Sequence, residues 1–212
     1  MNTWLILGGA LLSYMCFWYI VSILVKRNDV ADIAWGLGFI LLSWLSFYLE
    51  GMPENALVIN ILITIWALRL SWHIGSRLIG GSEDFRYARW RREWKNFHLR
   101  SFMQVFLLQG TLIYIVALPV IWVNMSDRPT NYLLYGAGIS IWLVGFLFES
   151  IGDHQLRKFK SNPENKGRLL TTGLWSYTRH PNYFGDAVQW WGIFTIALAF
   201  SGGWISVISP VV

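Results

Sequence analysis

The most chemically suggestive part of this sequence is the segment GLWSYTRHPNYFGD, residues 173–186. Directly before a long apolar run it gathers five polar side chains: Arg179, His180, Asn182, Tyr183 and Asp186. Polar groups where a helix enters a membrane cost free energy unless they bind something. The segment therefore predicts a site for an anionic, hydrogen-bonding ligand at the membrane surface. In the alternative, structural interpretation, Pro181 rigidifies the start of a helix and Asn182 caps it.

A second polar cluster precedes this segment and continues into basic residues: Glu149, Asp153, Arg157, Lys160 and Arg168. The first three are four residues apart, so they share one face of a helix. Carboxylates accept hydrogen bonds from hydroxyl or carboxamide groups, whereas arginine and lysine pair with phosphates. Ion pairs within the helix are the alternative. Residues 149–186 are therefore the predicted cofactor region.

Two further sites lie at the ends of other apolar runs. Asp29 and Asp32 open one run in the sequence NDVADIAWG, where Asn28 or Asp29 can cap a helix. Asp32 lies one turn deeper and is harder to solvate, which makes it the better candidate for chemistry. Another run ends in Arg69, His73 and Arg77, whose i, i+4, i+8 spacing places them on one helix face. Arg77 can extend to the membrane surface, whereas Arg69 lies two turns deeper and is expected to face the bundle, paired with a carboxylate or a ligand.

The loop after Arg77, GGSEDFRYARWRREW at residues 80–94, supports two interpretations. Its alternating arginine and tryptophan residues suit an interfacial helix in the lipid headgroup region. Alternatively, four of its residues form a lid over a site: Glu83, Asp84, Arg86 and Tyr87. The sequence does not decide between the two.

Composition shows which elements must position these residues. Hydrophobic residues make up 55% of the 212 residues and charged residues only 14%, which excludes an ordinary soluble domain. Apolar runs of about 20 residues are long enough to cross a bilayer, and six are predicted: 3–25, 31–49, 56–76, 101–124, 131–151 and 184–208. We predict an all-α, polytopic transmembrane helix bundle, with residues 1–212 forming a single integral-membrane domain.

Cysteine and histidine usage limits the chemistry. Cys16 is the only cysteine and lies inside the first apolar run, so neither a disulfide framework nor a cysteine metal site is expected. His154 stands next to Asp153, but no spacing around it matches a metal-ligand motif. No metal is therefore predicted.

The distribution of charge predicts a topology. Most of the 17 lysine and arginine residues fall at 26–27, 77–100 and 157–179, in the first, third and fifth loops. By the positive-inside rule these loops are cytosolic and the N-terminus lies outside. The net charge of +5 then reflects topology and anion capture, so no nucleic-acid partner is expected. The chain stops within an apolar stretch at residues 209–212, which predicts a truncated sequence.

Several motifs, in this order, resemble the steroid 5-alpha-reductase superfamily, in particular a bacterial branch of short integral-membrane proteins. They are DVADIAWG (29–36), WALRLSWHIGSR (66–77), GGSEDFRYARWRREW (80–94), LQG (108–110), ESIGDHQLRKFK (149–160) and GLWSYTRHPNYFGD (173–186). The core RHPNYFG is also similar to sterol reductases and to isoprenylcysteine or phospholipid methyltransferases. The motif at 149–160 and the order of the pieces favour the reductases.

The resemblance implies a seven-helix enzyme, here in a bacterial inner membrane. It implies that NADPH binds in a cytosol-facing cavity and that an activated carbon–carbon double bond of a steroid-like or isoprenoid-like substrate is reduced. Membrane lipids are the other expected partners. It also implies that these positions contact or support the cofactor: Glu149, Asp153, Arg157, Lys160, Arg168, Tyr177, Asn182 and Asp186. Arg179, His180 and Tyr183 complete the cofactor set.

The sequence departs from the animal reductases at the acid site. Those enzymes use a glutamate on the second helix and a tyrosine on the third, where this chain has Asp32 and Ile74. Isoleucine cannot donate a proton, so His73 is the substitute, and Asp32 and His73 are the predicted catalytic residues. The family also continues beyond residue 212 with a further helix and a tail that completes the cofactor site.

Two other function classes remain open. One is a methyltransferase that uses S-adenosylmethionine on a lipid or isoprenylcysteine, and the other is a non-catalytic membrane scaffold. The absence of a GxGxxG segment excludes a Rossmann site for the cofactor. The many phosphate-pairing side chains favour NADPH over S-adenosylmethionine.

Overall fold

The computed structural model describes residues 2–78 and 81–212, and within these ranges it contains helices and no strand. The described chain separates into two compact units. The first comprises residues 1–127 with Val212, and the second comprises Arg128–Val211. The all-α prediction is confirmed, and the prediction of one membrane domain over residues 1–212 stays a prediction.

Five helical segments of the described chain are long and apolar enough to cross a membrane: Thr3–Val25, Val30–Leu49, Glu54–Leu78, Phe97–Val116 and Tyr132–Ser161. The sixth predicted span, 184–208, corresponds to the helix Pro181–Leu198 and a short 3₁₀ helix after it, and is not among the five. This helix of 18 residues carries the polar side chains of Asn182, Asp186 and Gln189. The transmembrane bundle is confirmed, with one span fewer than predicted.

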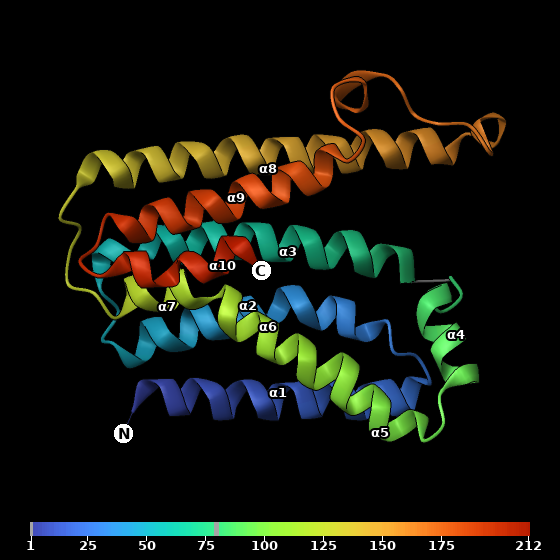
Figure 1. Cartoon of the computed structure of the whole chain (residues 1–212), viewed down its shortest axis with the longest axis horizontal. Coiled ribbons are helices and arrows are strands. Elements are labelled where there is room, and N and C mark those ends of the chain that lie inside the picture. Colours follow the sequence, from blue (N-terminus) through green and yellow to red (C-terminus); the bar gives the residue numbers. More distant parts are fainter. Residues whose placement is uncertain (1, 79–80) are drawn as a thin grey trace. The chain divides into compact units, whose positions relative to one another are not determined.

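The first unit contains all elements up to residue 124. They are α1 (Thr3–Val25), α2 (Val30–Leu49), η1 (Glu54–Ala56), α3 (Leu57–Leu78), α4 (Phe85–Glu93), α5 (Phe97–Ser101), the π-helical η2 (Phe102–Leu107), α6 (Leu108–Val116) and α7 (Leu118–Asn124). Helices α1, α2 and α3 run side by side, and α6 crosses them obliquely (Figure 1).

The segment predicted as one span over 101–124 is broken. Its helix ends at Val116, and α7 begins at Leu118 with Pro119 in its first turn. A proline lacks the N–H that would continue the preceding helix, but it fits the start of a new one. The break turns α7 so that it can pack against α2 and α3.

A buried polar cluster joins α2, α3 and α7 in the first unit. The Asn124 amide donates to Ser46 Oγ at 2.7 Å, and the Asn60 amide donates to Asn124 Oδ1 at 2.7 Å. Ser43 donates to Asn60 Oδ1. Polar side chains within a membrane are costly unless bonded, and these satisfy one another. The cluster therefore fixes the packing of three helices.

The second unit is a helix pair with a long returning loop. It contains α8 (Tyr132–Ser161), η3 (Pro163–Asn165), η4 (Gly173–Ser176), α9 (Pro181–Leu198), η5 (Gly203–Val207) and α10 (Ile208–Val211). Helix α8 extends beyond residue 151, the predicted end of the apolar span, and carries Asp153 and Arg157 on the same helix as Glu149, as the spacing predicted. Helix α9 lies along α8, and the loop between them folds back over the far end of α8 (Figure 1).

Glycines let α8 and α9 approach closely. A Cβ atom at Gly145 would lie 2.6 Å from the backbone nitrogen of Gln189 and 2.6 Å from the carbonyl oxygen of Gly185. A Cβ atom at Gly192 would lie 2.5 Å from the backbone nitrogen of Trp142. Real Cβ atoms do not pack so closely against a backbone, so only glycine permits this helix separation.

We expect Gly145→Ala to destabilise the second unit by about 1–3 kcal/mol, because the added methyl group must push the two helices apart. Thermal unfolding of the detergent-purified protein measures the effect. Gly136→Ala, on the same helix, is the matched control because a Cβ atom there meets nothing within 4 Å. Equal melting temperatures for the two variants would show that α8 and α9 are not held at this separation.

Candidate functional site

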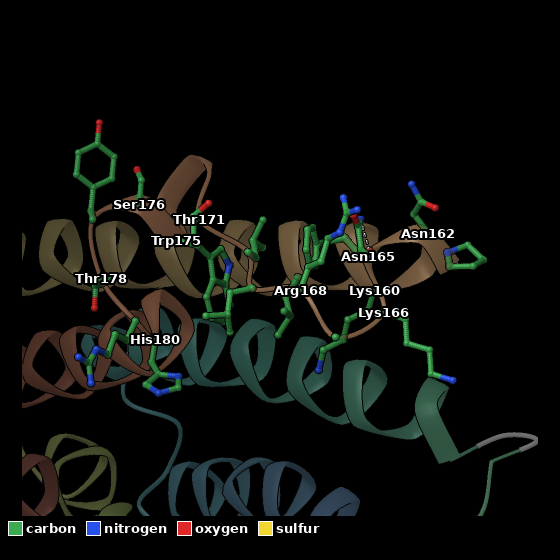
Figure 2. Close-up of a pocket in the computed structure, with 18 residues that line it drawn as sticks. Lys160, Asn162, Asn165, Lys166, Arg168, Thr171, Trp175, Ser176, Thr178 and His180 are labelled. Carbon is green, nitrogen blue, oxygen red and sulfur yellow. Dashed lines mark hydrogen bonds between the residues drawn. The ribbon is translucent and has the colours of Figure 1, made fainter.

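A large cavity lies in the second unit, between the end of α8 and the returning loop (Figure 2). Its volume is about 1080 Å³. Its lining residues lie between Leu156 and His180 and include four cations, Lys160, Lys166, Arg168 and Arg179. None of the lining residues is acidic. This arrangement suits a ligand that carries several negative charges.

Three hydrogen bonds hold the loop against α8. The Trp175 indole donates to the Gly152 carbonyl at 3.1 Å, and the Leu174 backbone N–H donates to Gln155 Oε1 at 3.0 Å. The Asn165 amide donates to the Phe159 carbonyl at 2.9 Å. Gly173 has φ of 64°, so the turn predicted there is present and needs glycine. Lys166, Arg168 and Arg179 are thus carried on a loop that is bonded to α8 near both its ends, and Lys160 lies on α8 itself.

Five of the predicted cofactor residues line this cavity: Lys160, Arg168, Tyr177, Arg179 and His180. Tyr177 is 85% exposed, so its ring lies at the margin. The sequence analysis missed Lys166, although its position two residues before Arg168 was a usable signal.

Other predicted cofactor residues form a polar seam between α8 and α9. The Asn182 amide donates to Asp153 Oδ1 at 3.1 Å, and the Gln189 amide donates to Glu149 Oε2 at 2.6 Å. Asp153, Glu149 and Gln189 are buried. These hydrogen bonds join α8 to α9. The alternative considered from the sequence was a set of ion pairs within α8 alone. The sequence analysis did not predict Gln189 as a site residue, because it lies inside the apolar run 184–208 and belongs to no motif.

Asn182 does not cap α9 as predicted. His180 occupies the N-cap position, Pro181 is the first helical residue, and the Asn182 side chain is used for Asp153 instead. Its own Oδ1 atom is buried and has no hydrogen-bond partner among the described residues. Asn182 therefore uses its amide as a hydrogen-bond partner, as predicted, but does not cap the helix.

The three remaining members of the predicted set do not line the cavity: Arg157, Tyr183 and Asp186. Arg157 and Tyr183 are exposed, and Asp186 is half-buried in the first turns of α9. The Tyr183 ring lies 5.2 Å from the His180 ring. Cofactor contact by these three residues, as by the other members of the predicted set, stays a prediction.

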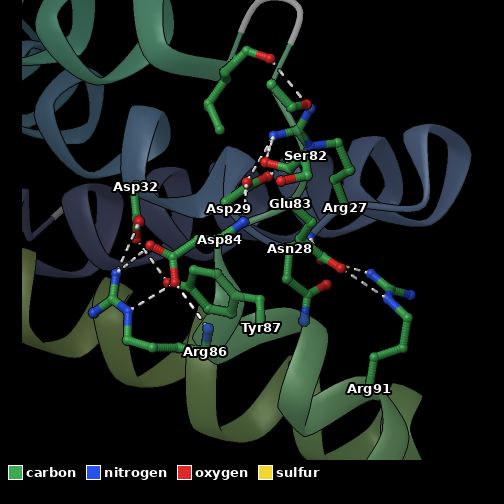
Figure 3. A network of polar contacts seen from close by, with 12 residues as sticks. Arg27, Asn28, Asp29, Asp32, Ser82, Glu83, Asp84, Arg86, Tyr87 and Arg91 are labelled. Atoms are coloured by element: carbon green, nitrogen blue, oxygen red, sulfur yellow. Dashed lines mark hydrogen bonds and ion pairs between the residues drawn. The ribbon is translucent and has the colours of Figure 1, made fainter. Parts of the chain in front are cut away.

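In the first unit, Asp32 is the centre of a second cluster (Figure 3). The Tyr87 hydroxyl donates to Asp32 Oδ1 at 2.7 Å, and the Arg86 guanidinium lies 3.6 Å from Asp32 Oδ2. The Gln109 amide approaches Asp32 Oδ1 at 3.4 Å. A proton donor, a carboxylate and a cation therefore meet here, which is an arrangement suited to proton transfer.

A network at the start of α2 positions α4 for this contact. The Asp29 carboxylate accepts from the Arg27 guanidinium at 2.8 and 3.0 Å and from the Asp84 backbone N–H at 2.9 Å. Glu83 accepts from the Asn28 backbone N–H at 2.7 Å and from Arg91 at 2.9 Å. Asp29 is at the N-cap position, as predicted, but its side chain makes no capping bond because its carboxylate is used for Arg27 and Asp84.

The contacts of residues 83–87 favour the lid interpretation of this loop, since two of its acids and Tyr87 bond to α2 and the residues before it. Burial, followed by the nearby Asp32 carboxylate, raises the pKa of Tyr87 above its ordinary value. Burial acts to raise the pKa of Asp84, but hydrogen bonds from Arg86 outweigh it and lower that pKa. Tyr87 is therefore a protonated donor at neutral pH.

His73 is half-buried on α3. The contacts around Asp32 come from Tyr87, Arg86 and Gln109, of which the sequence analysis singled out Arg86 and Tyr87 only as lid residues. Tyr87 is separated from Asp32 by 55 positions, so no local spacing pointed to the pair. Catalysis by His73 stays a prediction.

Comparison with known proteins finds one family that matches most of the chain and several relatives that match part of it. Residues 18–212 match the family described as "Protein of unknown function (DUF1295)". The mouse 3-oxo-5-alpha-steroid 4-dehydrogenase 1 is 32% identical over 65 residues, which cover 31% of this chain and 26% of the mouse protein. An uncharacterized protein of Schizosaccharomyces pombe is 24% identical over 217 residues, covering 86% of this chain and 61% of its own length.

A fungal protein of Ustilaginoidea virens, named "Probable O-methyltransferase ustE", is 43% identical over 68 residues, covering 32% of this chain and 22% of its own length. The matched part thus spans about a quarter of each of the first relatives. No solved structure matches this chain. The match over residues 18–212 confirms the resemblance seen in the sequence motifs, and the bacterial branch and the truncation stay predictions. The chain is an integral membrane protein that belongs to the DUF1295 family, a steroid 5-alpha-reductase-like family.

Proposed function

We propose that this protein is a membrane-embedded reductase that uses NADPH to reduce an activated carbon–carbon double bond in a lipophilic, steroid-like or isoprenoid-like substrate. The observation that carries the proposal is the cavity of about 1080 Å³ lined by four cations and no acid. The similarity of part of the chain to 3-oxo-5-alpha-steroid 4-dehydrogenases supports the reaction class.

The residues of the second unit fit a phosphorylated dinucleotide. Its phosphates would pair with Lys160, Arg168 and Arg179, since guanidinium and ammonium groups bind phosphate strongly. The cavity volume is at the upper end of small-molecule sites, as a dinucleotide requires. The buried Oδ1 atom of Asn182 would accept a hydrogen bond from a carboxamide group. When bound, the cofactor supplies a hydride.

In the proposed reaction, residues of the first unit supply the proton. A substrate carbonyl gains negative charge as the hydride arrives at its conjugated double bond, and a hydroxyl donor stabilises that charge. Tyr87 would be the donor. Without substrate its single hydroxyl proton bonds to Asp32 Oδ1 at 2.7 Å, and in the reaction this proton would turn to the substrate carbonyl while Asp32 keeps the phenol beside the site. Arg86, 3.6 Å from Asp32, offsets the negative charge that remains on the pair when the proton leaves.

Topology supports a cytosolic source for the cofactor. The basic loops at 77–100 and 157–179 are the ones that the positive-inside rule assigns to the cytosol, where dinucleotides are available. We accordingly place the N-terminus outside and the protein in a bacterial inner membrane.

A methyltransferase that uses S-adenosylmethionine is the second candidate. It is favoured by the likeness to the Ustilaginoidea virens protein and by the shared core RHPNYFG. S-adenosylmethionine carries no phosphate, however, so binding it would not require the four cations that line the cavity. A non-catalytic scaffold would bind neither cofactor.

Ligand-induced thermal stabilisation of the detergent-purified protein separates these functions. We expect saturating NADPH to raise the melting temperature because ligand binding to the native state alone stabilises it. Comparing NADPH with NADH, which lacks one phosphate group, measures how much that phosphate contributes to binding. Stabilisation by S-adenosylmethionine and not by NADPH would replace the reductase with the methyltransferase, and no stabilisation by either would favour the scaffold.

The seam between α8 and α9 gives a more specific prediction. We expect Asn182→Ala and Asp153→Ala each to weaken NADPH binding about tenfold while expression stays intact, because each loses one hydrogen-bonding partner of the proposed carboxamide site. Titration of NADPH into the purified variants measures the dissociation constant. Since the two side chains bond to each other, the double variant should lose less than the sum of the singles. Normal NADPH binding by both single variants would show that the seam is not part of the site.

A further inference from the structure

A separate cavity of about 390 Å³ lies in the first unit, where α1 ends and α5 begins. Three basic side chains line it: Lys26, Arg91 and His98. Ser22, Asn28 and Ser101 add polar groups, and no lining residue is acidic. The proposed reductase reaction does not use this cavity.

The walls of this cavity are fixed by hydrogen bonds between its two sides. The buried Asn28 amide donates to Ser101 Oγ at 2.7 Å, and the Tyr19 hydroxyl donates to the His98 carbonyl at 3.0 Å. Both bonds join the end of α1, or the residues just after it, to α5. The cavity is therefore part of the folded unit and does not depend on a surface side chain swinging into place.

The charge of the cavity comes from specific positions. Arg91 is oriented by Glu83, 2.9 Å away, and its guanidinium carbon lies 4.5 Å from the centre of the Phe97 ring. Glu83 offsets the charge of Arg91, so Lys26 supplies the further positive charge for an anion, and the His98 imidazole can donate a hydrogen bond to it. Lys26 is held at the end of α1 in the left-handed conformation, with φ of 56°. This fixes where its side chain leaves the helix.

The position of the cavity along the membrane spans identifies the source of the anion. Lys26 directly follows the span Thr3–Val25, and Phe97 begins the span Phe97–Val116, so the cavity lies at one end of both. Apolar side chains next to it are exposed on both segments, including Ile23 and Leu24 on α1 and Leu99 on α5. A polar, basic cavity bordered by exposed apolar residues at the end of a span is at the depth of lipid headgroups.

We infer that this cavity binds the phosphate headgroup of an anionic membrane lipid, with the lipid chains lying along the exposed apolar residues beside it. Basic residues at the cytosolic membrane surface each attract anionic lipid with about 1 kcal/mol. The side chains of Ser22, Asn28 and Ser101 bond within the protein and hold the cavity walls, so the basic side chains carry the attraction for the headgroup. This binding is independent of NADPH.

The test compares three probes on the full chain in detergent: phosphatidylglycerol, phosphatidylcholine and inorganic phosphate. We expect phosphatidylglycerol to bind and raise the melting temperature, and the other two to have little effect. Lys26→Gln should weaken phosphatidylglycerol binding about fivefold, and Lys26→Gln with His98→Gln about tenfold. Lys95→Gln is the matched control, because this exposed lysine lies just before α5 but does not line the cavity.

Each other outcome overturns the inference. Equal losses in Lys26→Gln and Lys95→Gln would show diffuse surface attraction instead of a site. If inorganic phosphate raises the melting temperature as much as phosphatidylglycerol does, the cavity is a site for free anions. If phosphatidylcholine binds equally well, the cavity does not distinguish lipids by their net charge. Unfolding of each variant without added lipid shows whether its fold is intact, and NADPH binding should remain normal in all of them.

Discussion

Replacing Arg168 and Arg179 together by glutamine should weaken NADPH binding about 100-fold, with each single replacement costing about tenfold. Both residues line the cavity of the second unit, and a charge-assisted hydrogen bond to phosphate contributes about 1.5–3 kcal/mol. Titration of NADPH into the detergent-purified variants gives the dissociation constants. The effect should shrink at high salt, because screening weakens the same ionic interactions in the unmodified protein.

The matched control removes the same number of charges from the same unit. Arg128 and Lys158 are exposed in the second unit and do not line the cavity, so Arg128→Gln with Lys158→Gln should leave NADPH affinity nearly unchanged. If this pair weakens binding as much as the cavity pair does, the protein attracts the dinucleotide through its net charge. Loss of S-adenosylmethionine binding in the cavity variants would instead assign the cavity to a methyltransferase.

Tyr87→Phe should lower kcat about 100-fold or more while NADPH affinity stays the same. The substitution removes only the hydroxyl that donates to Asp32, and loss of a positioned proton donor costs a reaction of this kind about 10²–10⁴-fold. The assay is NADPH oxidation with the most active member of a panel of lipophilic enones. Tyr114→Phe is the control, since it removes a hydroxyl from the same unit whose hydrogen bond is to the Trp4 carbonyl.

Asp32→Asn and His73→Gln distinguish the two catalytic assignments. If Tyr87 is the donor that Asp32 orients, Asp32→Asn lowers kcat strongly and His73→Gln changes it little. A large loss of kcat in His73→Gln, together with a normal kcat in Tyr87→Phe, would show that His73 is the proton donor. Because burial raises the pKa of Tyr87 above its ordinary value, its ionisation should not lower kcat between about pH 7 and pH 9.

The amino-acid sequence determined the class of the fold and the residues most suited to chemistry. Apolar runs of about 20 residues are a local property of the chain, so helices α1, α2, α3 and α8 could be predicted from the lengths of the apolar runs alone. The family motifs are local as well, and residues 173–186 proved to contribute to the basic cavity. Span limits were less certain, because the effects of Pro119 and of the polar residues of α9 depend on what they pack against.

Only the tertiary structure decided which side chains meet. Tyr87 reaches Asp32 because the network around Asp29 and Glu83 holds α4 at the start of α2, and no spacing in the sequence encodes that contact. Gln189 pairs with Glu149 because glycines on both helices let α8 and α9 approach closely. Hydropathy and helical periodicity extend over a few turns at most, whereas these contacts join residues far apart in the chain. The sequence therefore specified the candidate groups, and folding determined their partners.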